Sequence, residues 1–291
     1  MATTLTFKAF AREKATWCPG CGDFAVLRAM QEACVRLRLA SHRTVLVSGI
    51  GCSGKITSYF SSYGLHVHHG RTLPIATGVK LANRDLTVIA AGGDGDGYGI
   101  GLNHLIHAIR RDVDLTYIVM DNGVYGNTKG QTSPTTGTGT ITPSSPAGAV
   151  DEPVHPLRLA LAAGITYLAQ GVSSDVPQLA RLVEAGIRHC GFALINVFSP
   201  CPTYDRLRTY QWWRAHLINL DADPAYRPES RAQATEAVMT QDGSIVGLVY
   251  REKGRPLDAR LPGFSPTPLA DEEITPGLDA VRRLLDQEYL P

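Results

Sequence analysis

The residues best suited to chemistry in this chain of 291 residues are four cysteines in turns rich in glycine or proline. Cys18 and Cys21 form a Cys-x-x-Cys pair within WCPGCGD, Cys52 lies within GIGCSGK, and Cys201 lies within SPCPTY. Four thiolates suit either a zinc ion or an iron–sulfur cluster, and spacing alone does not choose between them. A structural zinc site usually pairs two Cys-x-x-Cys knuckles, whereas this chain has one.

The glycines of the stretch GIGCSGK match two nucleotide-binding patterns, and each match lacks the residue that carries its chemistry. They have the spacing of a dinucleotide fingerprint, but no acidic residue occurs between Gly54 and Asp85 to hold a ribose. The stretch also matches a P-loop as far as Lys55, but Ile56 stands where a serine or threonine must bind magnesium. An ordinary glycine turn between a strand and a helix, with a buried cysteine, stays open as an alternative.

Two polar residues at the ends of successive apolar runs form a second constellation. Asp94 lies within GGDGDGYGIG, and Asn122 follows 28 residues later within MDNGVYGN. A βαβ crossover would bring them to one edge of a sheet, where magnesium could take the Asp94 carboxylate, the Asn122 amide oxygen and the Val124 carbonyl. Gly93 and Gly95 would let backbone amides approach a diphosphate, and the start of the next helix favours an anion. The alternative is a capped turn between a strand and a helix.

Apolar and amphipathic runs alternate along the chain, which predicts an α/β fold with a parallel sheet and helices on both faces. Expected strands cover 43–49, 86–91, 115–120 and 192–200, and expected helices cover 24–38 (with Asp23 as N-cap), 98–111, 156–163 and 176–190. Residues 130–153 are rich in Gly, Ser, Thr and Pro without periodicity. A loop that long inside a domain is usually functional or disordered.

The pattern changes after residue 205. The later stretch has connections rich in proline and arginine, a predicted hairpin around Asp242 and Gly243 in AVMTQDGSIVGLVY, and a predicted helix in LDAVRRLLDQEY. We therefore divide the chain into a ligand-binding domain over residues 1–205 and an irregular C-terminal extension over residues 206–291.

Charge and hydropathy exclude some partners. With 28 Lys and Arg against 27 Asp and Glu, the net charge of +1 gives no reason to expect a nucleic acid or an anionic membrane as partner. No signal peptide and no apolar run of about 18 residues occurs, so we expect a soluble, cytoplasmic protein with reduced cysteines. Cys34 and Cys190 fall in stretches with helical periodicity and are expected to pack as small apolar side chains.

Six stretches together resemble the β subunit of the 2-oxoacid:ferredoxin oxidoreductases. They are WCPGCGD, GIGCSGK, HHGRTLPIATGVKLAN, GGDGDGYGIGLNH, DNGVYGNTKGQTSPTT and SPCPTY, which follow the family's order over roughly residues 15–205. The separation of Gly-Asp-Gly from the asparagine is similar to that in the thiamine diphosphate motif. The resemblance implies a thiamine diphosphate-binding fold.

The resemblance also implies a role for individual residues. A 4Fe–4S cluster would be held by Cys18, Cys21, Cys52 and Cys201, and magnesium by Asp94, Asn122 and the Val124 carbonyl. Thiamine diphosphate would be lined by Ile50, Gly51, Cys52, Ser53, His69, Gly93, Asp94, Gly95, Asp96, Asn122, Val124, Tyr125 and Gly126. His66, His68 and His69 could instead form a metal cluster, but neighbouring side chains of an extended segment point apart, so we favour His69 alone. Lys55, Lys129 and Asn127 are the candidates for contact with substrate.

The activity that the resemblance implies is the oxidative decarboxylation of a 2-oxoacid, with coenzyme A capturing the acyl group and ferredoxin receiving the electrons through the cluster. Our first choice of substrate is 2-oxoglutarate, which would give succinyl-CoA. Thiamine chemistry needs a carboxylate against the aminopyrimidine ring, and we find no glutamate in a motif that would supply it. We therefore expect a separate α subunit to carry the pyrimidine-binding domain, in a dimer of αβ pairs.

Departures from the family pattern keep alternatives open. Pro202 and Asp205 stand where valine and asparagine are expected, and Asn127 stands where members of broad specificity often have leucine. The last difference keeps pyruvate as an alternative substrate. Two other classes also remain: a cluster-free thiamine diphosphate-dependent decarboxylase or synthase, and a non-catalytic iron–sulfur scaffold.

Overall fold

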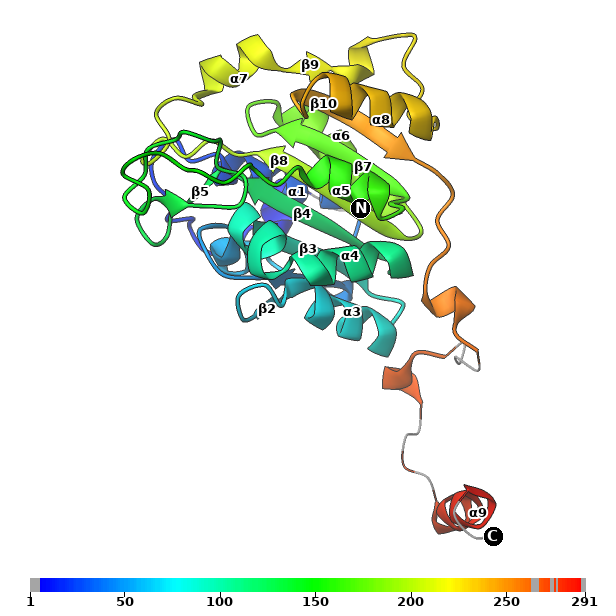
Figure 1. Ribbon diagram of the computed structural model, residues 1–291. Coiled ribbons are helices and arrows are strands. Elements are labelled where there is room, and N and C mark those ends of the chain that lie inside the picture. The colour runs from blue at the N-terminus through cyan, green and yellow to red at the C-terminus, as the bar shows by residue number, and fades with distance from the viewer. Residues whose placement is uncertain (1–5, 263–266, 273–274, 276, 289–291) are drawn as a thin grey trace.

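The computed structural model describes residues 6–262, 267–272, 275 and 277–288. Its centre is an eight-stranded sheet with the order β2-β1-β3-β4-β8-β7-β10-β9 (Figure 1). Neighbouring strands are parallel except β7 and β10, which are antiparallel. In that order the strands are Tyr63–His66, Thr44–Ser48, Thr87–Gly93, Leu115–Asp121, Phe192–Phe198, Tyr167–Val172, Ile245–Arg251 and Ile218–Asn219. A separate antiparallel pair, β5 (Val124–Tyr125) and β6 (Gln131–Thr132), lies in the loop that follows β4.

The central strands are apolar on both sides because helices cover both faces. In β1, Val45 and Val47 pack into one core while Leu46 packs into the other, and β3 and β4 alternate in the same way. One face is covered by α3 (Thr72–Ala82), α4 (Leu102–Arg111), α5 (Pro156–Ala162) and α8 (Arg231–Thr240), and the other by α1 (Asp23–Arg36), α2 (Ile56–Tyr59) and α6 (Val176–Arg188). This arrangement confirms the predicted α/β fold.

Most predicted elements are confirmed, with two local differences. The helix expected over 98–111 is α4, and a π-helical turn, Gly95–Ile100, precedes it. Asp23 is not an N-cap, because it is the first residue of α1 and its buried side chain accepts a hydrogen bond from Ser199. Helices α2 and α3 and strands β2, β5, β6, β7 and β9 were not anticipated.

The hairpin predicted around Asp242 and Gly243 is wrong. The residues before this pair form α8, whose Ala234 and Val238 are spaced by one helical turn and are buried against the core. Asp242 and Gly243 both have a left-handed backbone, with φ of 48° and 75°, and the Gly243 amide donates to the Val238 carbonyl. The Asp-Gly pair therefore ends a helix and leads into β10 instead of joining two strands.

Residues beyond 205 contribute to the sheet and then leave it. Helix α7 (Tyr210–His216) leads to β9, and β10 pairs with β7. The chain then runs away from the sheet to α9 (Leu278–Glu288), which confirms the predicted C-terminal helix and lies apart from the body (Figure 1). Over the described residues, none of the helices has the length and apolar character needed to cross a membrane.

Candidate active site at the carboxyl ends of the strands

The predicted cofactor residues meet at the carboxyl edge of the sheet. Strand β1 lies between β2 and β3 in the sheet. The chain runs from β1 outward to β2 and then returns past β1 to β3, so its direction across the sheet reverses between β1 and β3. Parallel sheets bind ligands in the crevice that forms at such a point. The loop after β1 carries Cys52, and the loop after β3 carries Asp94.

A cavity in this crevice brings together the whole set of residues predicted to contact thiamine diphosphate. Its lining consists of Ile50, Gly51, Cys52, Ser53, His69, Gly93, Asp94, Gly95, Asp96, Asn122, Val124, Tyr125, Gly126, Asn127 and Thr128. The exposed Lys129 and the half-buried Lys55 are not among the described residues that line it. Asn127 is therefore the candidate for substrate contact that the fold places in the cavity.

Asp94 is buried and already oriented by hydroxyl groups from the loop over residues 130–153. Ser133 Oγ and Thr135 Oγ1 donate to Asp94 Oδ2 at 2.5 and 2.8 Å. Burial raises the pKa of the Asp94 carboxyl, and these hydrogen bonds oppose the rise. The side-chain oxygen of Asn122 accepts from the Val124 amide at 3.0 Å, which fixes the amide group beside Asp94. Hydrogen bonds therefore hold the side chains of Asp94 and Asn122, two of the residues predicted to hold magnesium.

Asp121, the last residue of β4, is coupled to Asp94 through one side chain. Thr135 Oγ1 lies 2.7 Å from Asp121 Oδ1 and 2.8 Å from Asp94 Oδ2. The pKa of the Asp121 carboxyl is raised to about 7, first by burial and then by the charge of Asp94.

The Asp96 carboxylate accepts hydrogen bonds from the surrounding loops, so both of its oxygens already have partners within the chain. Its Oδ1 accepts hydrogen bonds from the Ile50 amide (3.1 Å) and the Gly70 amide (2.8 Å) and contacts His69 Nδ1 at 2.8 Å. Its Oδ2 accepts from Thr72 Oγ1 at 3.0 Å. One buried carboxylate thus joins the loop after β1 to the loop before α3 and orients the His69 ring.

Two features of the cavity fit a diphosphate. Ser53 Oγ is buried without a hydrogen-bond partner among the described residues, so this donor is available to a ligand. It would lie 3.1 Å from a methyl group placed on Gly93, which puts the hydroxyl beside the end of β3. Gly95 and Asp96, which begin the next helical turn, also line the cavity, and the start of a helix favours an anion.

The four candidate cluster ligands come from three segments that are far apart in sequence. A methyl group on Gly126 would lie 3.5 Å from Cys52 Sγ and 3.8 Å from Cys201 Sγ, so these two sulfurs are close. The Cys21 amide donates to the Cys18 carbonyl, and the Trp17 indole donates to the Cys52 carbonyl at 2.7 Å. These contacts place the Cys-x-x-Cys loop beside the loop after β1.

Backbone amides lie near two of the cysteine sulfurs, and a thiolate can accept hydrogen bonds from such amides. The amides of Thr203 and Tyr204 donate to Cys201 Sγ, and the Asp23 amide donates to Cys21 Sγ. Burial raises the pKa of Cys21 and Cys201, and it raises the pKa of Cys52 to about 11. Neutral thiols are therefore favoured in the bare chain, whereas a bound metal favours thiolates.

The other two cysteines lie away from this corner. Cys34 is buried in α1, as predicted, but the expectation for Cys190 is wrong, because it is exposed and lies beyond the end of α6 at Arg188.

In the described parts of the chain, no three side chains of His, Cys, Asp or Glu converge closely enough to hold one metal ion.

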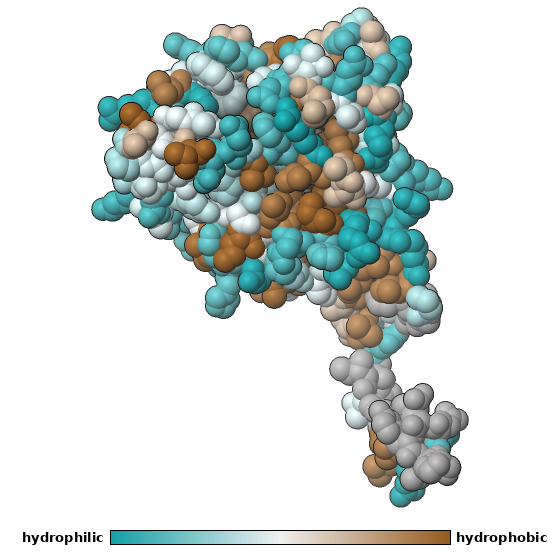
Figure 2. Space-filling view, viewed as in Figure 1, coloured by the Kyte–Doolittle hydropathy of each residue, from teal (hydrophilic) through white to brown (hydrophobic). Residues whose placement is uncertain are grey.

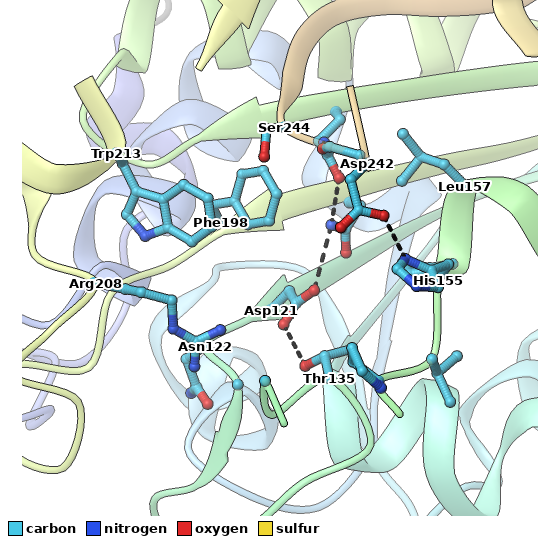
Figure 3. Close-up of a pocket in the computed structure, with 18 of the residues that line it drawn as sticks. Asp121, Asn122, Thr135, His155, Leu157, Phe198, Arg208, Trp213, Asp242 and Ser244 are labelled. Carbon is cyan, nitrogen blue, oxygen red and sulfur yellow. Dashed lines mark hydrogen bonds and ion pairs between the residues drawn. The ribbon is translucent and has the colours of Figure 1, made fainter. Parts of the chain in front are cut away.

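Figure 3 shows a second cavity, and Asn122 lines both this cavity and the first one. Asp121 and Thr135 lie at its base, Phe198 and Trp213 form one wall, and His155 lies opposite. The rings of Phe198 and Trp213 are stacked with centroids 3.9 Å apart. The second cavity brings α7 and the turn after α8 next to the strand ends.

The sequence analysis missed the hydroxyl groups that orient the two carboxylates. Thr72, Ser133 and Thr135 were not proposed, and neither was Asp121. The available signal was the long loop rich in serine and threonine, which indicated a function without indicating which hydroxyl groups would turn inward.

The fold and the cavity lined by Cys52 and Asp94 define the chain as a thiamine diphosphate enzyme. Residues 49–197 match the family model for the C-terminal TPP binding domain of thiamine pyrophosphate enzymes. Residues 201–265 match the family model for the C-terminal part of the pyruvate ferredoxin oxidoreductase beta subunit.

Individual relatives narrow this class. A 2-oxoacid:ferredoxin oxidoreductase subunit beta from Saccharolobus solfataricus is 47% identical over 249 residues, covering 81% of this chain and 82% of the relative. A 2-oxoglutarate synthase subunit KorB from Archaeoglobus fulgidus is 43% identical over 192 residues, covering 66% and 72%. The solved 2-oxoglutarate:ferredoxin oxidoreductase from Magnetococcus marinus, with 2-oxoglutarate, coenzyme A and succinyl-CoA bound, matches with a TM-score of 0.85, 36% identity and 88% of each chain covered. The chain belongs to the family of 2-oxoacid:ferredoxin oxidoreductase β subunits, which are thiamine diphosphate-dependent.

Proposed function

We propose that the enzyme containing this β subunit performs the oxidative decarboxylation of 2-oxoglutarate to succinyl-CoA and passes the electrons through a 4Fe–4S cluster to ferredoxin. The observation that carries the proposal is the position of Cys52. It lines the cavity proposed for thiamine diphosphate, and its sulfur lies close to that of Cys201. A cluster bound there would adjoin the cofactor that supplies its electrons.

The chain's own residues would bind the cofactor and its ion. Asp94, Asn122 and the Val124 carbonyl would hold magnesium, and the Ser53 hydroxyl and the amides near Gly95 would bind the diphosphate. Thiamine diphosphate supplies the carbanion chemistry that breaks the bond to the carboxylate of a 2-oxoacid. Asp96 would keep His69 at the edge of the cavity by holding Nδ1, which leaves Nε2 available to the bound molecules.

A cubane cluster suits the cysteine arrangement better than a single zinc ion. A single zinc ion needs ligands that converge on one point, and no three His, Cys, Asp or Glu side chains among the described residues do so. Each iron of a cubane takes its own thiolate, so the four ligands of a cubane need not converge. The amides that donate to Cys21 and Cys201 would stabilise charge on a cluster's sulfur ligands.

Six unbridged cysteines suit a reducing compartment, so we place the complex in the cytoplasm.

The substrate assignment depends on Asn127 and on the relatives. The relatives include a 2-oxoglutarate synthase subunit and an oxidoreductase with bound 2-oxoglutarate and coenzyme A, which support 2-oxoglutarate. Asn127 lines the cavity and presents an amide where an apolar side chain would suit broader specificity. That amide favours pyruvate as the second candidate.

A partner subunit would complete the active site. The two carboxylates in the cavity, Asp94 and Asp96, already accept hydrogen bonds from this chain, so the carboxylate for the aminopyrimidine would come from another chain. Ile50 in the loop after β1, Ile75 in α3 and Ile100 before α4 are 41%, 42% and 52% exposed. Figure 2 shows further apolar atoms gathered over α4 and α5. An α subunit would cover apolar surface of this kind. Within the extension over 206–291, Tyr210 donates to the Gly20 carbonyl in the Cys-x-x-Cys loop, which supports packing of the extension on the cluster site.

The test is an assay of viologen reduction by the anaerobically purified αβ complex, with 2-oxoglutarate or pyruvate and coenzyme A. We expect the value of kcat/KM to be higher for 2-oxoglutarate, and a higher value for pyruvate would favour the second candidate. The β subunit alone should give no turnover. Turnover by the complex without iron and acid-labile sulfide would overturn the proposed electron path and favour a cluster-free thiamine enzyme.

A further inference from the structure

Asp23 is a fully buried carboxylate two residues after Cys21. Its Oδ1 accepts a hydrogen bond from Ser199 Oγ at 2.6 Å. Its Oδ2 is buried without a hydrogen-bond partner among the described residues. A buried carboxylate so poorly compensated is costly, so its position calls for a functional explanation.

The contacts of Asp23 and Gly22 fasten two cysteine loops together. The Gly22 amide donates to the Pro200 carbonyl at 3.1 Å, next to the hydrogen bond between Asp23 and Ser199. A methyl group on Gly22 would lie 2.5 Å from Ser199 Oγ and 2.7 Å from Ser173 Oγ, so only glycine fits there. The loop with Cys18 and Cys21 is therefore clamped to the segment directly before Cys201, 176 residues away.

The charge of Asp23 also reaches the cysteines. Asp23 lies two residues after Cys21, and Ser199, which donates to its carboxylate, lies two residues before Cys201, so the charge lies beside two of the loops whose sulfurs are the proposed ligands. A negative charge at such a position opposes the addition of an electron to a cluster held by those sulfurs.

We propose that Asp23 is a positioning residue for the cluster. Through Ser199 it holds the two cysteine loops in register, and its carboxylate keeps the reduction potential of the cluster low. This inference rests on the proposed function, because it requires that the four cysteines bind a 4Fe–4S cluster. A low potential suits a cluster that must reduce ferredoxin.

The test compares three variants with wild type in the anaerobically purified αβ complex at one pH. Asp23→Asn keeps an oxygen that can accept from Ser199 but removes the charge. Ser199→Ala removes the clamp and keeps the charge. Asp85→Asn is the matched control, since Asp85 pairs with Arg43 on the exposed surface before β3, at the opposite edge of the sheet. The readouts are iron and sulfide content, the rate of iron release to a chelator, and the midpoint potential from a redox titration followed by electron paramagnetic resonance.

We expect Asp23→Asn to keep the wild-type iron content and to shift the midpoint potential upward. Ser199→Ala should release iron several-fold faster with a smaller change in potential, and Asp85→Asn should match wild type. Equal potentials in Asp23→Asn and wild type would overturn the inference, and so would an Asp23→Asn complex that cannot hold the cluster. A wild-type complex without iron and sulfide would instead refute the cluster of the proposed function, and this inference with it.

Discussion

Asp94 and Asp121 share a single hydroxyl group, since Thr135 Oγ1 lies within 2.8 Å of both carboxyl groups. A hydroxyl has one hydrogen and can donate to only one of the two carboxyls. We infer that the other carboxyl is protonated and donates to the hydroxyl, so that the pair holds an extra proton. The raised pKa of Asp121 agrees with this arrangement.

The first prediction concerns the pH dependence of stability in magnesium-free buffer. The pKa of Asp121 is about 7 in the folded chain against its ordinary value of 3.8, so its stabilising contribution is complete below about pH 4 and is lost as the pH rises through 7. Asp121→Asn mimics the protonated form and removes this dependence. Between pH 5 and pH 8 we expect the free energy of unfolding of wild type to fall relative to the variant by about 1 kcal/mol or more. Urea denaturation at several pH values measures it, and a difference that does not change with pH would contradict the shared proton.

The second prediction concerns Asp96. Asp96→Ala removes the acceptor for the Ile50 and Gly70 amides, the Thr72 hydroxyl and His69. We expect a loss of about 3 kcal/mol in unfolding free energy and at least tenfold weaker binding of thiamine diphosphate, because buried amides lose their acceptor and the loops loosen. Thr72→Val is the control, since it removes one hydrogen bond and should cost about 1 kcal/mol. Calorimetric titration of each complex with thiamine diphosphate and magnesium measures the binding. Equal affinities of the two variants for the cofactor would contradict the prediction.

The third prediction separates Cys52 from Cys190. Cys52→Ser should remove iron from the complex and lower viologen reduction at least tenfold, because one proposed ligand and its link to the cofactor are lost. The same substitution at the exposed Cys190 should leave both quantities unchanged. Iron analysis and activity measured on the same preparations test the pair, and a Cys52→Ser complex with full iron content would remove Cys52 from the ligand set.

The fourth prediction concerns the indole of Trp17. Trp17→Phe keeps an aromatic ring between Phe24 and Tyr59 but loses the 2.7 Å hydrogen bond to the Cys52 carbonyl. We expect a loss of about 1 kcal/mol in unfolding free energy and faster release of iron to a chelator. An unchanged rate of release would mean that this hydrogen bond does not hold the loop.

The site could be predicted from sequence wherever strand order and short spacing determine the geometry. Asp94 and Asn122 meet because each follows a strand of one βαβ unit, and parallel strands end at the same edge. Asp96 was placed in the cavity correctly, but its partners come from segments that a linear pattern does not connect. Ser133 and Thr135 lie in a loop without periodicity, where folding alone decides which hydroxyls turn inward. The predicted hairpin failed because an Asp-Gly pair with a left-handed backbone can end a helix as well as join two strands.

The four cysteines differ in their access to solvent. Cys201 is buried, Cys21 and Cys52 are half-buried, and Cys18 is exposed. A cluster held by this set would have one corner at the cofactor cavity and another at the molecular surface. Dioxygen could reach that outer corner as readily as an electron carrier could, so the exposure that would serve electron transfer would also make the cluster sensitive to oxidation in air.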